Sequence, residues 1–172
     1  LVERFGAEVL RILLEDPERI AEIKGISKEK AKKAGEAYRE LQSMQSIVMF
    51  LQKYNVNANI AVKVYNTLGA NAVKAIEENP YILADRIDGV SFKVSDTIAF
   101  NMGLPRNSVV RIRTGIKYIL QHAAYTTGHT YLPKVVLTEH AAYTLQVEEH
   151  EVEGAVAELI SRRELFLDNV DN

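Results

Sequence analysis

Two short turns bring together residue types that could bind a ligand. Each consists of a glycine, an aliphatic residue and a serine: Gly25-Ile26-Ser27 and Gly89-Val90-Ser91. An apolar helical pattern follows each turn, so each serine is placed as the N-cap of a helix. The N–H groups of a first helical turn have no carbonyl partner inside the helix and attract anions. We therefore expect each turn either to hold a phosphate or, as an open alternative, only to pack two helices together.

Basic residues lie near both turns and favour the same kind of ligand. Lys24 and Lys28 flank the first turn, and Arg86 and Lys93 flank the second. Basic residues on an exposed helix can also be no more than a solvated face. Contacts with a nucleic-acid backbone would fix position without reading bases. The full set of candidate DNA contacts is Lys24, Gly25, Ile26, Ser27, Lys28, Arg86, Gly89, Val90, Ser91, Lys93, Arg106, Arg111 and Lys117.

Other chemistry is not supported by the residue spacing. The sequence has no cysteine, and its four histidines show no metal-site spacing. Asp85, Asp88 and Asp96 surround the second turn and could suggest nuclease carboxylates, but we expect Asp85 and Asp96 to cap helices or pair with helix dipoles. All nine glycines are isolated, so the sequence lacks the phosphate loop that ATP hydrolysis by a P-loop motor requires. We expect no catalytic residue, metal or cofactor here.

Tyr125 and Tyr131 could stack on bases, but core packing is the favoured prediction for both.

Composition limits what the whole surface can do. Of the 172 residues, 47% are hydrophobic and 26% charged, as in globular proteins. No apolar run approaches the roughly 20 residues that span a membrane, and no signal pattern is present, so we expect no membrane association and a cytoplasmic location. A net charge of −2 means that any nucleic-acid footprint must be a local patch. Because the sequence starts at Leu1, we expect it to be a piece of a longer protein.

The elements that position the two turns form an internal repeat. At an offset of 63, five residues recur: Gly6, Ala7, Glu15, Pro17 and Ala21 match Gly69, Ala70, Glu78, Pro80 and Ala84. After one extra residue near Arg86, the match continues at an offset of 64 with Ile23, Gly25 and Ser27 against Ile87, Gly89 and Ser91. Matching Gly, Pro and Ser at turns predicts two copies of one supersecondary unit. Each copy reads as a helix-hairpin-helix.

The remaining segments also read as helices. Apolar residues at helical spacing predict helices over 1–14, 108–126, 134–145 and 151–162, and residues 55–59 should interrupt a helix that contains Ile47 and Leu51. Residues 164–168 alternate like a strand and could pair with Thr130–Leu132 in a winged-helix-like segment. The predicted fold is therefore mostly α, with tandem helix-hairpin-helix units followed by a small winged-helix-like segment with one or two short strands. The predicted sections are 1–68, 69–127 and 128–172.

Five blocks occur in a fixed order in the sequence. They are Asn79-Pro80-Tyr81-x-Leu83, Ile87-x-Gly89-Val90-Ser91-Phe92, Ser95-Asp96-x-Ile98-Ala99, Arg111-x-x-x-Gly115-Ile116-x-Tyr118-x-Leu120 and Gly128-His129-Thr130-Tyr131-Leu132-Pro133. Their order and spacing resemble the N-terminal region of RecD/TraA-type ATP-dependent DNA helicases, superfamily 1 enzymes related to the alpha subunit of exodeoxyribonuclease V. The resemblance covers about Phe5 to Asp168. At both turns the family has Gly-hydrophobic-Gly where this sequence has a serine third, so the serine hydroxyl would compete with phosphate for the same N–H groups.

The resemblance implies a role beside a motor. The chain would bind a DNA single strand or junction through its backbone and guide it for a 5′-to-3′ helicase in DNA repair or recombination. ATP and Mg²⁺ would belong to motor domains of the same parent protein, outside these residues. The alternative is a scaffold that holds the motor domains or a partner subunit without touching DNA.

Overall fold

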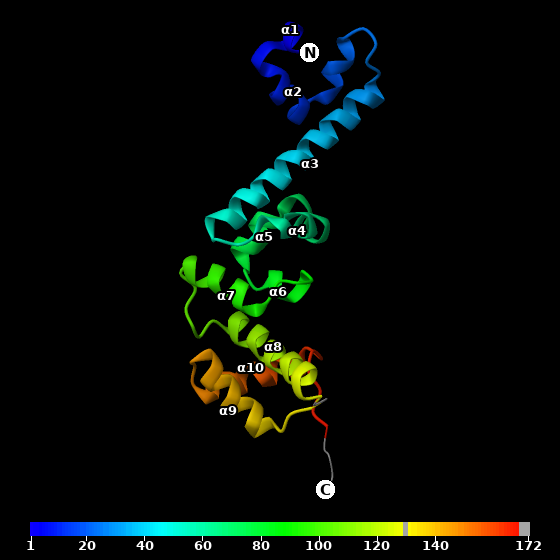
Figure 1. Ribbon diagram of the computed structural model, residues 1–172. Coiled ribbons are helices and arrows are strands. Elements are labelled where there is room, and N and C mark those ends of the chain that lie inside the picture. Colours follow the sequence, from blue (N-terminus) through cyan, green and yellow to red (C-terminus); the bar gives the residue numbers. More distant parts are fainter. Residues whose placement is uncertain (129–130, 169–172) are drawn as a thin grey trace. The chain divides into compact units, whose positions relative to one another are not determined.

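The described part of the chain is mostly helical, with turns and short irregular segments between the helices (Figure 1). The computed structural model describes residues 1–128 and 131–168, and no strand occurs among them. The chain forms two compact units, Leu1–Val73 and Lys74–Asn172. Among the described helices, none combines the length and apolar character needed to cross a membrane. The mostly α prediction is confirmed.

The first unit is arranged along one long helix. Its elements in order are α1 (Val2–Phe5), η1 (Gly6–Glu8), α2 (Val9–Glu15), η2 (Pro17–Glu22), α3 (Lys28–Lys53), η3 (Ala58–Ile60), α4 (Ala61–Leu68) and η4 (Gly69–Asn71), where η denotes a 3₁₀ helix. Helix α3 packs against α2 and η2 and also against α4 and η4. A Cβ on Gly35 would lie 2.6 Å from the Cβ of Pro17, so the absence of a side chain lets α3 approach η2 closely.

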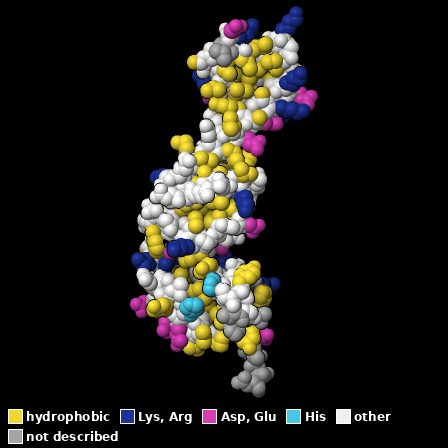
Figure 2. Space-filling model, viewed as in Figure 1, with side chains coloured by type: hydrophobic (Ala, Val, Ile, Leu, Met, Phe, Trp, Pro, Cys, Tyr) yellow, Lys and Arg dark blue, Asp and Glu magenta, His cyan; other side chains and the backbone are white. Residues whose placement is uncertain are grey.

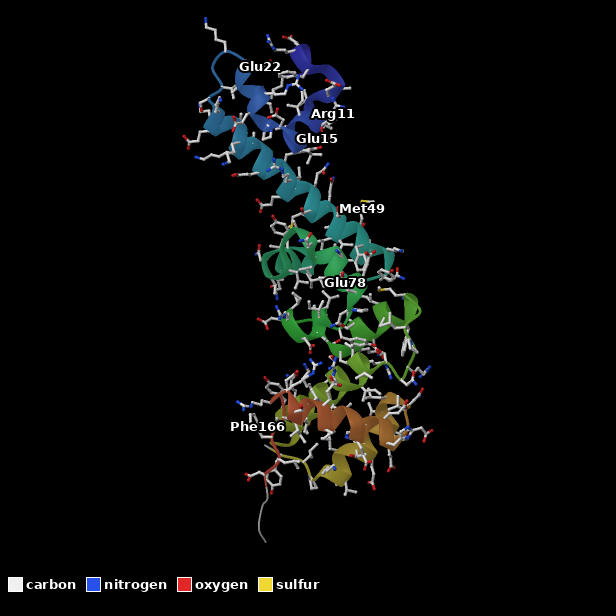
Figure 3. The ribbon with its side chains drawn as sticks, turned by 180° about the vertical axis from the view of Figure 1, so that it is seen from behind. Arg11, Glu15, Glu22, Met49, Glu78 and Phe166 are labelled. Atoms are coloured by element: carbon white, nitrogen blue, oxygen red, sulfur yellow. The ribbon has the colours of Figure 1, made fainter. Side chains whose placement is uncertain are left out.

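The apolar side chains around α2, η2 and the start of α3 are only partly covered, whereas Ile47, Leu51 and Val64 of the same unit are buried. Ile12, Ile20 and Ala31 form a small buried core. Beside it lies an open hollow of about 580 Å³ lined mainly by apolar residues of α2, η2 and α3. Figure 2 shows hydrophobic side chains gathered on the face of this unit that is in view. Exposed charges pair locally in this unit, since Arg11 of α2 contacts Glu8 of η1. Arg11 also lies near Glu15 on the same helix (Figure 3).

The helix predicted over residues 1–14 is interrupted. It consists of α1, η1 and α2, and the break falls at Gly6, whose φ is +54°. A left-handed residue cannot continue a right-handed helix. The chain therefore turns once before α2 begins.

The second unit holds a larger core. Helix α5 (Ala72–Glu78) lies at the boundary, and α6 (Ile82–Arg86), α7 (Phe92–Asn101), α8 (Val109–Thr127), α9 (Lys134–Leu145) and α10 (Glu149–Ser161) follow. Helices α8, α9 and α10 contact one another in all three pairs, and α7 packs against α6 and α8. Tyr81, Phe92, Ile116, Leu145 and Leu159 are among the buried core residues. The predicted helices at 108–126, 134–145 and 151–162 are confirmed within a few residues.

The predicted terminal strand is not formed. Residues 164–168 are irregular, and Phe166 is exposed (Figure 3). Arg163 has a φ of +58°, and the N–H groups of Glu164 and Leu165 donate to the carbonyl of Leu159. These residues therefore close the last turn of α10 instead of pairing as a strand. Of the predicted partner segment, Thr130 lies outside the described residues, and Tyr131 and Leu132 are irregular.

The internal repeat is confirmed at the level of local structure. Elements η1 and α2 correspond to η4 and α5 at the same offset of 63, and Gly6 and Gly69 both have positive φ. After the prolines the copies differ, because the first copy has one residue fewer before its Gly-aliphatic-Ser turn. In the first copy this stretch forms the tighter 3₁₀ helix η2, and in the second copy it forms the α-helix α6.

Candidate nucleic-acid interface

The turn between α6 and α7 has the geometry of a helix-hairpin. Gly89 has a φ of +88°, a conformation that a side chain would strain. The N–H of Val90 donates to the carbonyl of Ile87 at 3.1 Å, and the Val90 side chain is buried. The buried aliphatic residue anchors the turn, so its backbone is held in one position.

The turn between η2 and α3 repeats this geometry. Gly25 has a φ of +95°, and the N–H of Ile26 donates to the carbonyl of Ile23 at 3.1 Å. Ser27 and Ser91 have nearly identical backbone angles, with φ of −77° and −79° and ψ of 156° and 157°. The two turns are therefore the same local structure, one in each compact unit.

Both serines cap their helices, and each cap uses one N–H group. The Ser27 hydroxyl accepts from the N–H of Lys30 at 3.2 Å, and the Ser91 hydroxyl accepts from the N–H of Val94 at 3.4 Å. These are the third residues of α3 and α7. The N–H groups of the first two residues, Lys28 and Glu29 or Phe92 and Lys93, have no carbonyl partner within the helix. The serine cap therefore occupies one of the three N–H groups of each first turn and leaves the other two without a carbonyl partner in the helix.

The cations near the turns differ in their availability. Lys24, Arg86 and Lys93 are exposed and form no ion pair among residues 1–128 and 131–168. Lys28 is exposed but lies 3.5 Å from the Glu18 carboxylate. The second turn therefore offers two free cations. The first turn offers one free cation and one that is shared with a carboxylate.

Arg111 corrects the predicted contact set, because it is buried. Its side chain is 4% exposed and forms a forked ion pair with Asp96, at 2.8 Å from Nε to Oδ1 and 3.1 Å from Nη2 to Oδ2. Its Nη1 donates to the carbonyls of Arg106 and Leu145 at 2.7 and 2.8 Å. With its donors engaged inside the unit, the guanidinium joins α7, α8 and the end of α9. It is not positioned to meet a phosphate.

Asp96 completes this buried group, in a role other than the predicted capping. The Tyr81 hydroxyl donates to Asp96 Oδ1 at 2.6 Å. Burial raises the pKa of the Tyr81 hydroxyl far above its usual value, and the neighbouring Asp96 carboxylate adds to the rise. A charged pair inside a protein is stable only when its remaining hydrogen-bonding capacity is used. Tyr81 and the two carbonyls supply those partners.

The other predicted cations of α8 and its approach are also engaged. Lys117 lies 2.9 Å from Asp85 and 3.2 Å from Glu164, so its charge is largely balanced. Arg106 is exposed, donates to the Gln146 side chain and lies over the Phe100 ring. Arg111 and Lys117, the two predicted DNA contacts on α8, are therefore both held in ion pairs. Among the described residues no group of three or more His, Asp or Glu side chains could hold a metal.

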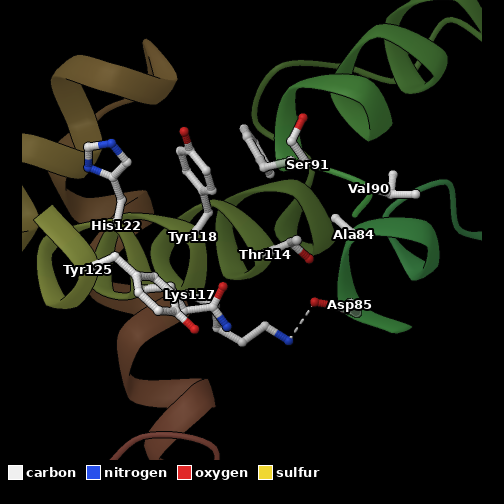
Figure 4. A pocket seen from close by; sticks show the side chains of 11 residues that line it. Ala84, Asp85, Val90, Ser91, Thr114, Lys117, Tyr118, His122 and Tyr125 are labelled. Carbon is white, nitrogen blue, oxygen red and sulfur yellow. Dashed lines mark ion pairs between the residues drawn. The ribbon is translucent and has the colours of Figure 1, made fainter. Parts of the chain in front are cut away.

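A groove of about 500 Å³ lies beside the second turn (Figure 4). One wall is formed by Val90, Ser91 and Phe92, and the other by α8 residues that include Tyr118, His122 and Tyr125. The lining of the groove is polar as well as aromatic, because it also includes Thr114, Gln121 and the Lys117–Asp85 pair. The favoured prediction of core packing for Tyr125 and Tyr131 is wrong, since they are 91% and 63% exposed.

The helix break predicted over residues 55–59 also contains a residue with positive φ. Between α3 and α4, Asn55 has a φ of +56°, and the N–H of Val56 donates to the carbonyl of Leu51 at 2.9 Å. The side chain of Asn57 caps the following 3₁₀ helix by accepting from the N–H of Asn59. Asn tolerates positive φ, so Asn55 was a local signal for this turn. The hydrogen bond here spans five residues, whereas those of Ile26 and Val90 span three.

Comparison with known proteins places most of this region in one family. The family described as the ATP-dependent RecD2 DNA helicase HHH domain matches residues 40–131. That range includes the Asn55 and Gly89 turns and excludes the Gly25 turn. An ATP-dependent RecD2 DNA helicase from Deinococcus radiodurans is 23% identical over 134 residues, which is 78% of this chain. The chain spans 19% of that relative's length.

Proposed function

Because this chain belongs to the family of ATP-dependent RecD2 DNA helicase HHH domains, we propose that it binds DNA without regard to base sequence and guides a strand toward a helicase motor. On this proposal the motor lies outside residues 1–172. It would use ATP and Mg²⁺, move 5′ to 3′ and serve DNA repair or recombination in the cytoplasm. The chain's own part is to hold a strand or junction by its backbone.

The observation that carries the proposal is the repeated turn with unpaired amides beside free cations. The first two N–H groups of α3 and of α7 point out of their helices, and phosphate is the anion that such groups suit. Backbone amides and flexible cations contact phosphate and sugar, which are the same at every base. The proposed binding is therefore independent of sequence.

The second turn is the principal contact in this proposal. Arg86 and Lys93 flank it without carboxylate partners among the described residues, and it lies within the family match. At the first turn, Lys28 lies 3.5 Å from the Glu18 carboxylate and must leave it to reach a phosphate. We therefore assign the larger share of the affinity to the second turn.

Charge reversal tests the proposal in the whole chain. Fluorescence anisotropy with a labelled single-stranded oligonucleotide at low salt should show weak binding that Lys28→Glu together with Lys93→Glu largely abolishes. The matched control is Lys134→Glu, which makes the same charge change at the start of α9 and should alter the affinity little. Glu149→Lys should also have little effect. Oligonucleotides of different base sequence and equal length should bind about equally.

Two outcomes would contradict the assignment. If the lysine reversals leave affinity unchanged while Arg162→Glu and Arg163→Glu remove it, the DNA path follows the end of α10 instead of the turns. If no salt-dependent affinity is found at all, the chain acts as a scaffold for the motor domains or a partner subunit.

A further inference from the structure

Four aromatic rings form a ladder that runs from the core of the second unit into the groove beside the Gly89 turn. Tyr81 and Phe92 stack with centroids 5.7 Å apart, and Phe92 and Tyr118 stack at 5.6 Å, both with an interplanar angle of 22°. Tyr118 and His122 follow at 6.0 Å. Tyr81 and Phe92 are buried, whereas Tyr118 is 38% exposed. The ladder therefore begins in the core and ends on rings open to solvent.

Tyr125 extends this aromatic wall. Tyr118, His122 and Tyr125 lie at i, i+4 and i+7 on α8, so they project from one face of the helix. Figure 4 shows them along the groove, with Tyr118 between His122 and the turn residue Ser91 in that view. The Tyr125 side chain is 91% exposed, so packing within the chain does not explain an aromatic ring at this position.

We propose that this groove binds unpaired bases of single-stranded DNA, with a base stacked on the Tyr118, His122 and Tyr125 wall and the adjoining phosphate near the first turn of α7. This inference rests on the proposed DNA binding and adds the kind of strand that is bound. Only unpaired bases expose their faces, because in a duplex both faces are covered by neighbouring pairs. Base–aromatic stacking tolerates any base, so it preserves sequence independence.

The lining of the groove suits a nucleic-acid base better than it suits a wholly apolar ligand. Ser91, Thr114 and Gln121 supply hydroxyl and amide groups along its wall, which suit the polar edges of a base. The Asp85 carboxylate, which would repel a phosphate, is paired with Lys117 at 2.9 Å. Lys93 is exposed on the second residue of α7, where it can meet the backbone of the same strand.

The test compares an oligonucleotide that has bases with an abasic one of equal length and charge. Tyr125→Ala should weaken binding of the base-containing strand by about fivefold or more, the lower end of stacking effects seen on alanine substitution. It should leave the affinity for the abasic strand and for a duplex unchanged. Tyr125→Phe, which keeps the ring, should retain the affinity. The matched control is Tyr143→Ala, because Tyr143 is 86% exposed on α9 and does not line the groove.

Three results would overturn the proposal while leaving DNA binding intact. The first is equal loss for the base-containing and abasic strands with Tyr125→Ala. The second is an effect of Tyr143→Ala as large as that of Tyr125→Ala. The third is competition by a deoxynucleoside monophosphate as strong as that of the strand at equal nucleotide concentration, which would mean that the groove holds a free nucleotide. Failure of the wild-type chain to bind any of these nucleic acids would instead overturn the proposed function.

Discussion

Replacing Arg111 should strongly destabilise the second unit, because its guanidinium is buried and paired with Asp96. Arg111→Met removes the forked ion pair with Asp96 and the two donors to the carbonyls of Arg106 and Leu145. The Asp96 carboxylate, whose side chain is 16% exposed, would keep only the Tyr81 hydroxyl as a described partner. An uncompensated charge would then remain inside the unit.

The expected loss follows from the cost of leaving that charge unpaired. Removing one partner of a buried ion pair costs about 3–5 kcal/mol. Arg111→Lys keeps the positive charge but cannot form the planar fork or reach both carbonyls, so we expect roughly half of that loss, about 2 kcal/mol. Arg162→Lys is the control, because Arg162 is 53% exposed in an i,i+4 pair with Glu158. Its effect should stay within about 0.5 kcal/mol.

Urea denaturation of the full chain, read by hydrogen exchange in peptides from α7 to α9, measures this loss in the unit concerned. Such a local readout is needed because two compact units need not unfold together. If Arg111→Lys is as stable as the wild type and instead lowers DNA affinity, Arg111 is a DNA contact and the structural role assigned to it is wrong.

Three further predictions concern backbone and pH. Gly89→Val should destabilise the second unit by about 1 kcal/mol or more, because valine does not tolerate a φ of +88°, and an unchanged melting temperature would contradict this. Gly115→Ala should destabilise the second unit, because the new Cβ would lie 2.6 Å from the buried Leu145 side chain. Gly154→Ala, whose Cβ would have no atom within 4 Å, should stabilise the unit by about 0.5–1 kcal/mol. Equal shifts in melting temperature for the two variants would refute the packing argument. Because the pKa of Tyr81 is raised in the folded chain, its contribution to stability is intact below about pH 10 and should fall as pH rises further, by at most about 1.4 kcal/mol per pH unit. Urea unfolding between pH 8 and 11 should show this fall in the wild type relative to Tyr81→Phe, and parallel curves would contradict it.

Local patterns in the sequence predicted the helices and turns because these depend on neighbouring residues. Apolar spacing located α8 and α9, and both Gly-aliphatic-Ser segments form turns that precede a helix. The serine caps form as predicted at Ser27 and Ser91. The repeat was also visible, because its turn residues recur at a constant offset.

What the sequence could not supply are contacts between residues far apart in the chain. Asp96 and Arg111 are both charged, and nothing in their spacing shows that two helices bring them within 2.8 Å. The close approach of Leu145 to Gly115, one helical turn after Arg111, is likewise a contact between residues far apart in the chain. Residues 164–168 alternate as a strand does, but they close the end of α10 and have no partner strand among the described residues.

The salt dependence of DNA binding tests the central claim most directly, because it counts phosphate contacts. For single strands, the logarithm of the association constant should fall linearly with the logarithm of salt concentration, by about 0.7 per phosphate contact. We predict that Lys93→Glu reduces this slope by about 0.7 to 1 and that Lys134→Glu leaves it unchanged. A slope near zero in the wild type, or the same slope in wild type and Lys93→Glu, would contradict phosphate binding at the Gly89 turn.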